Sequence, residues 1–209
     1  MDAITEELNI FIDGVESMTK DVENHIANRQ NDFRSMCFYN MYNRGILTRE
    51  IVTLLGKSVR PFQEEDATNQ ELERMMIVTR GLFIDTMSSI EKAAKDCLPA
   101  YWMNDIKEEV LKQSSYTYLR TIIEVSATKG LVTENELKDW ESVFLMRNLV
   151  IHNNSESDRS MVFELDDIHI SMRPNRMMKG PSTTFIKLSE KAAELFYQWL
   201  IRVDGAYKR

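Results

Sequence analysis

The chain has 209 residues, of which 43% are apolar and 28% are charged, and its net charge is −7. That length and apolar content suffice for one large domain, or for one domain with a helical extension, and they exclude a chain that is disordered throughout. The acidic balance argues against a protein that binds long duplex nucleic acid, because such proteins usually present a basic surface. It does not exclude an enzyme that contacts only a few phosphates.

The two cysteines and the amino terminus limit the kinds of site and the compartment that the sequence predicts. Cys37 and Cys97 lie in segments that read as helices and have no partners at metal-binding spacing, so neither a disulfide framework nor a zinc site is predicted. No apolar run reaches the length of a membrane span, and the acidic start of the chain lacks the order of a signal peptide. We therefore expect a cytoplasmic protein that uses no cofactor or metal.

The first part of the chain is predicted to be helical. Apolar residues at helical spacing indicate helices over about residues 2–27, 31–42 and 48–57, with a break at Gly45. Residues 60–66 read as a linker, because Pro61 cannot occupy a helix interior and an acidic run follows it. This pattern divides the chain into an N-terminal helical extension, residues 1–60, and a helical domain, residues 69–209.

The second part begins with more helices. A long helix is predicted from about residue 69 to 98, ended by Pro99, and further helices start near residue 101 and cover 116–129. Gly130 stands where a left-handed C-terminal cap is expected. Thr133 to Glu136 has the form of a capping box, which begins a helix that should end near residues 153–154.

The pattern changes near the C-terminus. Alternating apolar residues predict two short strands, 161–165 and 168–172, and a third strand at 183–188. Ser189 is the expected N-cap of the last helix. The fold class is therefore mainly α, a helical bundle with a small β-hairpin element near the C-terminus.

The helix over residues 134–152 contains an unusual arginine. Residues 143–151 are apolar on nearly every side of the helix, which is typical of a buried helix. Arg147 lies on the core stripe between Phe144 and Ile151, and the positions one turn away are all apolar. Because an unpaired buried guanidinium is costly, Arg147 must meet a partner from elsewhere, or the helix must line a cleft or a subunit interface.

Two further polar residues follow Arg147 on this helix. Asn148 and His152 are four residues apart and so share one face. Together with Arg147 they supply a fixed cation, an amide and a group that titrates near neutral pH. From spacing alone, an ion pair and a capping residue are the more common roles of such an Arg and His.

Residues 147–153, Arg-Asn-Leu-Val-Ile-His-Asn, resemble the signature of HEPN domains. That signature is an Arg, usually followed by a polar residue, and a His after an interval of four to six residues; here the interval is four, and Asn153 follows the His as it often does in that superfamily. The resemblance extends over about residues 69–209, while residues 1–60 and the strands within 161–188 depart from it. It implies a HEPN-like helical bundle that acts as a metal-independent endoribonuclease.

The resemblance also implies residue roles. His152 would take the proton of a ribose 2′-hydroxyl or donate one to the leaving 5′-oxygen, Arg147 would hold the phosphate and stabilise its growing charge, and Asn148 would orient the phosphate or the His. One His cannot easily serve as both acid and base, so a homodimer in which two motifs face one cleft is expected. HEPN proteins are commonly toxins or act in antiviral defence or RNA processing, which implies such a role here.

Other interpretations stay open. Asn153, Arg173, Arg176 and Lys179 are weaker candidates for RNA binding; the last three form a basic patch with Lys187, although a solvated loop is the more common role of such a run. The chain is alternatively a non-catalytic HEPN-type module, a binding or scaffold unit that interacts with a partner protein or a nucleotide. A third hypothesis is a regulatory, antitoxin-like protein whose residues 1–60 dock on a partner through an apolar surface.

Overall fold

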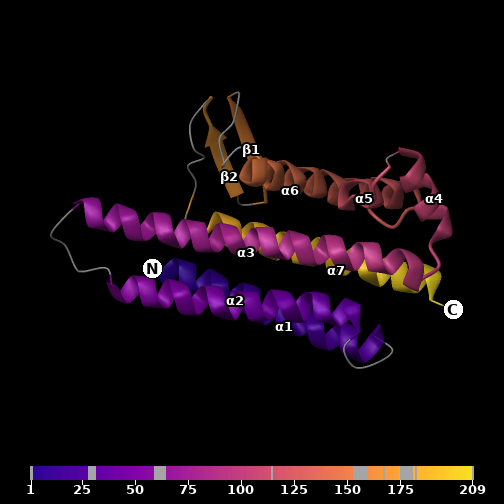
Figure 1. Cartoon of the computed structure of the whole chain (residues 1–209), viewed down its shortest axis with the longest axis horizontal. Helices are drawn as coiled ribbons and strands as arrows, with labels where there is room; N and C mark the ends of the chain where they lie inside the picture. The colour runs from indigo at the N-terminus through magenta and orange to yellow at the C-terminus, as the bar shows by residue number, and fades with distance from the viewer. Residues whose placement is uncertain are drawn as a thin grey trace.

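The computed structural model describes residues 2–27, 32–58, 65–113, 115–152, 160–166, 168–174, 181 and 183–208. Within these residues the chain is mainly α, with seven helices and one two-stranded antiparallel hairpin (Figure 1). The elements are α1 (Asp2–His25), α2 (Phe33–Ser58), α3 (Glu65–Ala100), α4 (Asn104–Gln113), α5 (Leu119–Thr128), α6 (Glu134–His152), β1 (Met161–Leu165), β2 (Ile168–Met172) and α7 (Thr184–Tyr207). The predicted helical fold class and the hairpin with its strand bounds are confirmed.

The helices form a bundle and a layer that covers it. α1 packs against α2 and α7, and α3 packs against the same two helices, so α1, α2, α3 and α7 close a four-helix bundle. α4, α5 and α6 follow the other side of α3, and α6 also contacts α7 and β1 (Figure 1). The N-terminal helices α1 and α2 therefore share the core with α3 and α7. The predicted division into residues 1–60 and 69–209 stays a prediction.

α2 continues through Gly45, so the predicted break at this residue is wrong. The reason is the close packing of α1 on α2. A Cβ atom on Gly45 would lie 2.9 Å from Cγ1 of Ile12 and 3.1 Å from the ring of Phe11, and both side chains are buried. Glycine lets the two helices approach, and this packing outweighs the ~1 kcal/mol by which glycine disfavours a helix interior.

The third predicted strand, 183–188, is also wrong, because α7 begins at Thr184. Phe185 and Leu188 are buried on a helical stripe that continues to Phe196 and Trp199. Burial of this stripe against the bundle outweighs the β propensity of the local sequence. Ser189 is not an N-cap: it lies within the helix, where its hydroxyl donates to the carbonyl of Phe185 at 2.7 Å.

Several helix ends were predicted from single residues. Gly130 has a φ of +75° and caps α5 as predicted, while backbone bonds from Gly130 to Ala127 and from Leu131 to Ser126 close the turn. The capping box before α6 is confirmed, since the Glu136 carboxylate accepts from the Thr133 amide at 2.8 Å. α4 and α5 begin about three residues later than predicted, at Asn104 and Leu119.

A buried polar network joins α2, α3 and α7 at one end of the bundle. Arg34, at the start of α2, donates to both carboxylate oxygens of Asp32, at 2.7 and 2.6 Å, and to the hydroxyl of Tyr101 in the turn after α3. Tyr101 in turn donates to Asp204 of α7 at 2.8 Å. Burial raises the pKa of the Tyr101 hydroxyl above its usual value, so it stays a donor. These bonds satisfy charges that would otherwise be costly to bury.

Hydrogen bonds join the N-terminal end of α6 to α7. Arg202 donates to both carboxylate oxygens of Glu136, at 2.6 and 2.7 Å, and to the carbonyl of Leu131 at 3.2 Å. The hydrogen bonds from Arg202 lower the pKa of Glu136 from 4.5 to about 2. A bidentate arginine pair is among the stronger polar contacts in proteins, so the first turn of α6 is held firmly in place.

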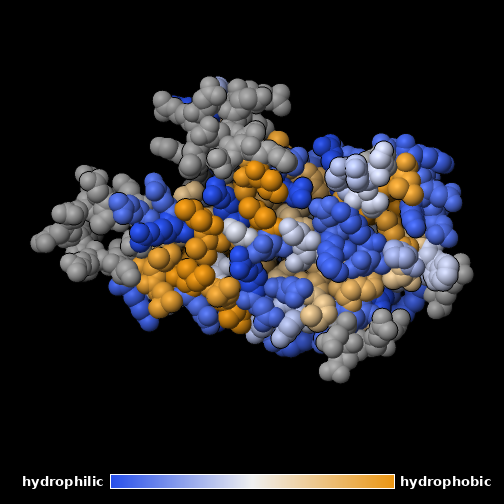
Figure 2. Space-filling model, in the orientation of Figure 1, coloured by the Kyte–Doolittle hydropathy of each residue, from blue (hydrophilic) through white to orange (hydrophobic). Residues whose placement is uncertain are grey.

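Apolar side chains gather on one face of the molecule where α2 ends and α3 begins (Figure 2). In these two helices Leu54 and Ile77 are 63% and 58% exposed, and Leu47 is 42% exposed. Gathered apolar side chains often mark contact with another molecule, and the docking hypothesis for residues 1–60 requires such a surface.

None of the described helices is both long and apolar enough to cross a membrane.

Replacing Gly45 with valine should destabilise the protein, because the added carbons would collide with Ile12 and Phe11. Overpacking of this kind costs about 1–3 kcal/mol. The matched control is Gly14→Val in α1, where a Cβ would meet no atom within 4 Å. We expect urea unfolding to show a clear loss for Gly45→Val and little change for Gly14→Val; equal effects would contradict the close approach of α1 and α2.

Replacing Glu136 with glutamine should remove a pH-dependent part of the stability. The pKa of Glu136 is lower in the folded chain, about 2, than its ordinary 4.5. Its contribution is therefore complete above pH 4.5 and is lost as the pH falls toward 2. Allowing for partial exposure, we expect a deficit on the order of 2 kcal/mol near neutral pH.

Unfolding free energies of wild type and Glu136→Gln, measured by urea titration from pH 7 to about pH 2, would test this expectation. The gap between the two proteins should close as Glu136 becomes protonated. Glu124→Gln is the control, because Glu124 pairs with Arg120 on the exposed surface of α5 and such pairs contribute about 0.5 kcal/mol or less. A gap that is constant across this pH range would contradict the assignment.

Candidate functional site

Arg147 has the partner from elsewhere that the sequence requires. Its side chain is 31% exposed, and its Nη2 lies 3.1 Å from Oε2 of Glu91 on α3. Glu91 is 56 residues away along the chain, so the packing of α6 on α3 creates this pair. Arg147 is thus a half-buried cation fixed at the junction of two helices.

Glu91 is shared between two cations. Its other carboxylate oxygen, Oε1, accepts a hydrogen bond from Lys95 one turn further along α3, at 2.8 Å. The three side chains together carry a net charge of +1, counting two cations and one anion. The bond to Glu91 uses one of the five N–H donors of a guanidinium. Glu91 therefore orients Arg147 and leaves it able to bind an anion.

A cavity of about 280 Å³ opens beside this pair. Its apolar lining includes Met87 of α3, Leu119 of α5 and Phe144 of α6, which are all buried. The other lining residues are mainly polar, and they are Glu91, Tyr118, Arg120, Thr121, Arg147 and Asn148. An apolar floor with a few polar groups that converge on it is the usual form of a small-ligand site.

The structure places the predicted catalytic residues as follows. Arg147 and Asn148 line the cavity, and Asn148 is exposed. His152 is the last residue of α6, so its Cα lies about 7.5 Å beyond that of Arg147 along the helix axis, at ~1.5 Å per residue. The side chain of His152 lies outside the part of the chain that the structure describes. The distance between the guanidinium of Arg147 and the imidazole of His152 is therefore part of the prediction.

The weaker candidates for RNA binding are only partly described. Asn153, Arg176 and Lys179 lie outside the described residues. Arg173 follows β2 directly and is exposed. Lys187, which was predicted to lie in the third strand and to share the basic patch, lies in α7 instead, with its Nζ 3.4 Å from Oε1 of Glu7 of α1. Of the predicted basic patch, Arg173 alone remains as an exposed cation among the described residues.

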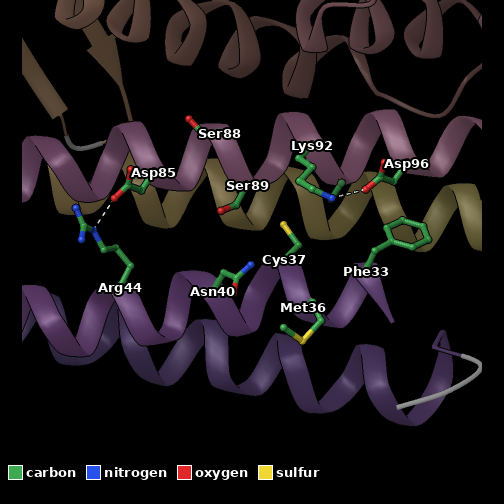
Figure 3. Close-up of a pocket in the computed structure, with 11 residues that line it drawn as sticks. Phe33, Met36, Cys37, Asn40, Arg44, Asp85, Ser88, Ser89, Lys92 and Asp96 are labelled. Atoms are coloured by element: carbon green, nitrogen blue, oxygen red, sulfur yellow. Dashed lines mark hydrogen bonds and ion pairs between the residues drawn. The ribbon is translucent and has the colours of Figure 1, made fainter. Parts of the chain in front are cut away.

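A larger cavity, of about 460 Å³, lies between α2 and α3 (Figure 3). It is bounded by two ion pairs, Arg44 with Asp85 and Lys92 with Asp96. Burial raises the pKa of the Cys37 thiol in its wall, which disfavours the reactive thiolate. The charges around this cavity are paired, and its thiol is not activated. The smaller cavity beside Arg147 is therefore the better candidate for a functional site, although its volume is smaller.

Sequence reasoning missed four residues at or next to the candidate site. Glu91 and Lys95 read as an ordinary ion pair on one helix face, and no local pattern connects Glu91 with α6. Tyr118 and Arg120 join the site because the start of α5 lies against α3 and α6. An unpaired arginine on an apolar stripe was the available signal that a distant carboxylate was needed.

Comparisons with models of protein families, with curated proteins and with solved structures found no match for this chain. The resemblance to HEPN domains therefore stays a prediction, which rests on the sequence of residues 147–153 and on the position of Arg147, Asn148 and His152 in the last turns of α6. Geometry and residue chemistry must carry any functional conclusion.

The contact between Glu91 and Arg147 should appear as an energetic coupling. We expect a double-mutant cycle with Glu91→Gln and Arg147→Met to give a coupling of about 0.5–1.5 kcal/mol in the free energy of unfolding, because the pair is partly shielded from water. The control cycle uses Lys92→Met and Asp96→Asn, an exposed pair on the other side of α3, where ~0.5 kcal/mol or less is expected. Additive effects at Glu91 and Arg147 would contradict the predicted coupling.

Proposed function

We propose that this chain is a metal-independent endoribonuclease whose site combines Arg147, Asn148 and His152. One observation carries the proposal: Glu91 orients a half-buried guanidinium at the edge of a cavity, on the helix that ends in His152. A fixed cation next to a group that titrates near neutral pH is what phosphodiester cleavage by the ribose 2′-hydroxyl requires. The resemblance of residues 147–153 to the HEPN signature supports the same reaction.

The reaction proceeds by transfer of the phosphoryl group within the RNA. His152 removes the proton of the 2′-hydroxyl, the 2′-oxygen forms a bond to phosphorus, and the bond from phosphorus to the 5′-oxygen breaks. A second imidazole, in its protonated form, donates a proton to the leaving 5′-oxygen. The products are a 2′,3′-cyclic phosphate and a 5′-hydroxyl. Arg147 stabilises the charge that grows on the non-bridging oxygens, and Asn148 orients the phosphate.

A homodimer supplies the second imidazole in this proposal. A two-fold interface brings the same surface together twice, so two copies of α6 would bring two motifs to one cleft. Ile151, which lies within the motif, is 42% exposed, and the exposed Asn148 lies one turn before it on α6. Ile151 therefore offers apolar surface that a second copy would bury. Two Arg147 side chains in one cleft would repel each other until a phosphate lies between them.

The biological setting follows from the same resemblance. Endoribonucleases of this type serve as toxins, in antiviral defence or in RNA processing, and we place this chain in that group. Control of such an activity by a protein partner or antitoxin is part of the proposal. The apolar surface that includes Leu47 and Leu54 of α2 is where such a partner would bind.

The alternative is a HEPN-type module that binds a partner protein or a nucleotide without cleaving RNA. The net charge of −7 and the carboxylate of Glu91 in the cavity wall both oppose tight RNA binding. In that case Arg147 and Glu91 form a structural ion pair. Substitution of His152 would then leave the function unchanged.

Incubation of purified protein with mixed RNA in EDTA tests the enzyme. We expect wild type to produce fragments that end in a 2′,3′-cyclic phosphate, and His152→Ala and Arg147→Ala to lose about 100-fold or more of that activity. His169→Ala is the matched control, because His169 is exposed on the hairpin and faces Glu164. It should cleave as wild type does.

Equal cleavage by all four proteins would mean a contaminating nuclease, and no cleavage by any of them would favour the binding module. Loss of activity in the His169 control would argue against His152 as the particular imidazole. Size-exclusion chromatography with light scattering on the same samples shows whether the active species is a dimer. Activity from a monomer would remove the second imidazole from the mechanism.

A further inference from the structure

Two tyrosines with exposed rings precede α5, next to the candidate site. Tyr116 is 70% exposed and Tyr118 is 52% exposed. Their ring centroids lie 6.1 Å apart, and the ring planes are inclined by 54°. Tyr118 also lines the cavity that contains Arg147 and Asn148. An exposed aromatic ring at the edge of a cavity offers a flat apolar face to a ligand.

A second guanidinium stands on the same rim. Arg120 lines the cavity two residues after Tyr118, and its side chain is 57% exposed. Its pair with Glu124, at 2.8 Å, joins two exposed residues one turn apart on α5. Exposed pairs of this kind are weak, so an anion can take the place of Glu124 at little cost. Arg120 and Arg147 thus approach one cavity from α5 and α6.

We infer that Tyr118 and Arg120 form a subsite for one nucleotide of single-stranded RNA, in which a base stacks on Tyr118 and its phosphate contacts Arg120. The inference rests on the proposed function and extends its site beyond the motif. Every base has a π-face, so stacking on an aromatic ring tolerates any sequence. Arginine matches the geometry of a phosphate through two N–H donors. The exposed amide of Asn148 can contact a base edge or a ribose hydroxyl.

The size of the cavity and the net charge of the chain favour single-stranded RNA over duplex RNA as the ligand. A volume of about 280 Å³ is slightly below the ~300–1,000 Å³ of sites that enclose a whole drug-sized ligand, so it suits one nucleotide of a longer strand. Bases in a duplex are already stacked and cannot reach Tyr118. With a net charge of −7, the protein attracts RNA only locally, so the salt dependence of binding should reflect very few phosphates.

Fluorescence anisotropy with a labelled single-stranded 12-mer of 2′-O-methyl RNA tests the subsite. This probe cannot be cleaved through its 2′-oxygen, so binding is measured apart from catalysis. We expect Tyr118→Ala to weaken binding roughly tenfold or more, whereas Tyr118→Phe keeps the ring and should bind within about twofold of wild type. Arg120→Gln should weaken binding and lower the slope of log K against log salt by about one.

Tyr39→Ala is the matched control, because Tyr39 is 46% exposed on α2 and stacks on Tyr42 away from this cavity. It should bind the 12-mer as wild type does, and a duplex of the same sequence should bind roughly tenfold more weakly than the single strand. Thermal melting of each variant verifies that it is folded. If Tyr118→Ala misfolds, the other two variants still test the subsite. Arg120→Gln tests it through the salt dependence of binding, and Tyr118→Phe tests it through an affinity within about twofold of wild type.

The results separate this inference from the proposed function. Dependence of binding on Tyr118 and Arg120, without any cleavage of natural RNA, would retain the subsite and remove the endoribonuclease. Cleavage that depends on His152, with binding unchanged by Tyr118→Ala and by Arg120→Gln, would retain the enzyme and overturn the subsite. Failure of the wild type to bind the 12-mer, or equal binding of duplex and single strand, would also overturn it.

Discussion

The burial of α3 on two sides is the constraint on which the rest of this structure depends. α2 and α7 pack on it within the bundle, and α4, α5 and α6 cover its other side (Figure 1). Consecutive residues of α3 consequently face different parts of the protein. Glu91 lines the cavity beside α6, while Lys92 lines the cavity beside α2. The large apolar side chains of α3 that these helices cover are buried, as Leu82, Phe83 and Ile90 are.

This arrangement explains why an arginine is tolerated in an apolar helix. α6 buries Phe144, Met146 and Leu149 against the rest of the protein, which carries Arg147 to the edge of α3, where Glu91 meets it. Lys95 binds the same carboxylate, so Glu91 stays neutralised if Arg147 turns toward an anion. The packing that stabilises the fold thus also produces an oriented cation beside a cavity.

Many charged side chains of this protein are paired with a neighbour on the same helix. The chain as a whole is acidic, and many of its surface charges form pairs along a single helix, as Lys20 with Glu16 and Lys92 with Asp96 do. Such pairs contribute little to stability or to long-range attraction. In the proposed function, recognition of an anionic ligand therefore depends on two guanidiniums at one cavity, Arg120 and Arg147, and on the ring of Tyr118 next to them.

The sequence by itself determined the helical class, the hairpin, the capping box at Thr133 and the cap at Gly130, because these depend on residues that are neighbours in the chain. It also indicated that Arg147 needs a distant partner. Only the tertiary structure decided which residue that is, because Glu91 belongs to another helix and no local pattern links the two. The same holds for two of the wrong assignments. Gly45 reads as a break until Phe11 and Ile12 pack on it, and residues 183–188 read as a strand until the bundle buries them as a helical stripe: in both cases contacts between distant segments outweigh the preference of the local sequence.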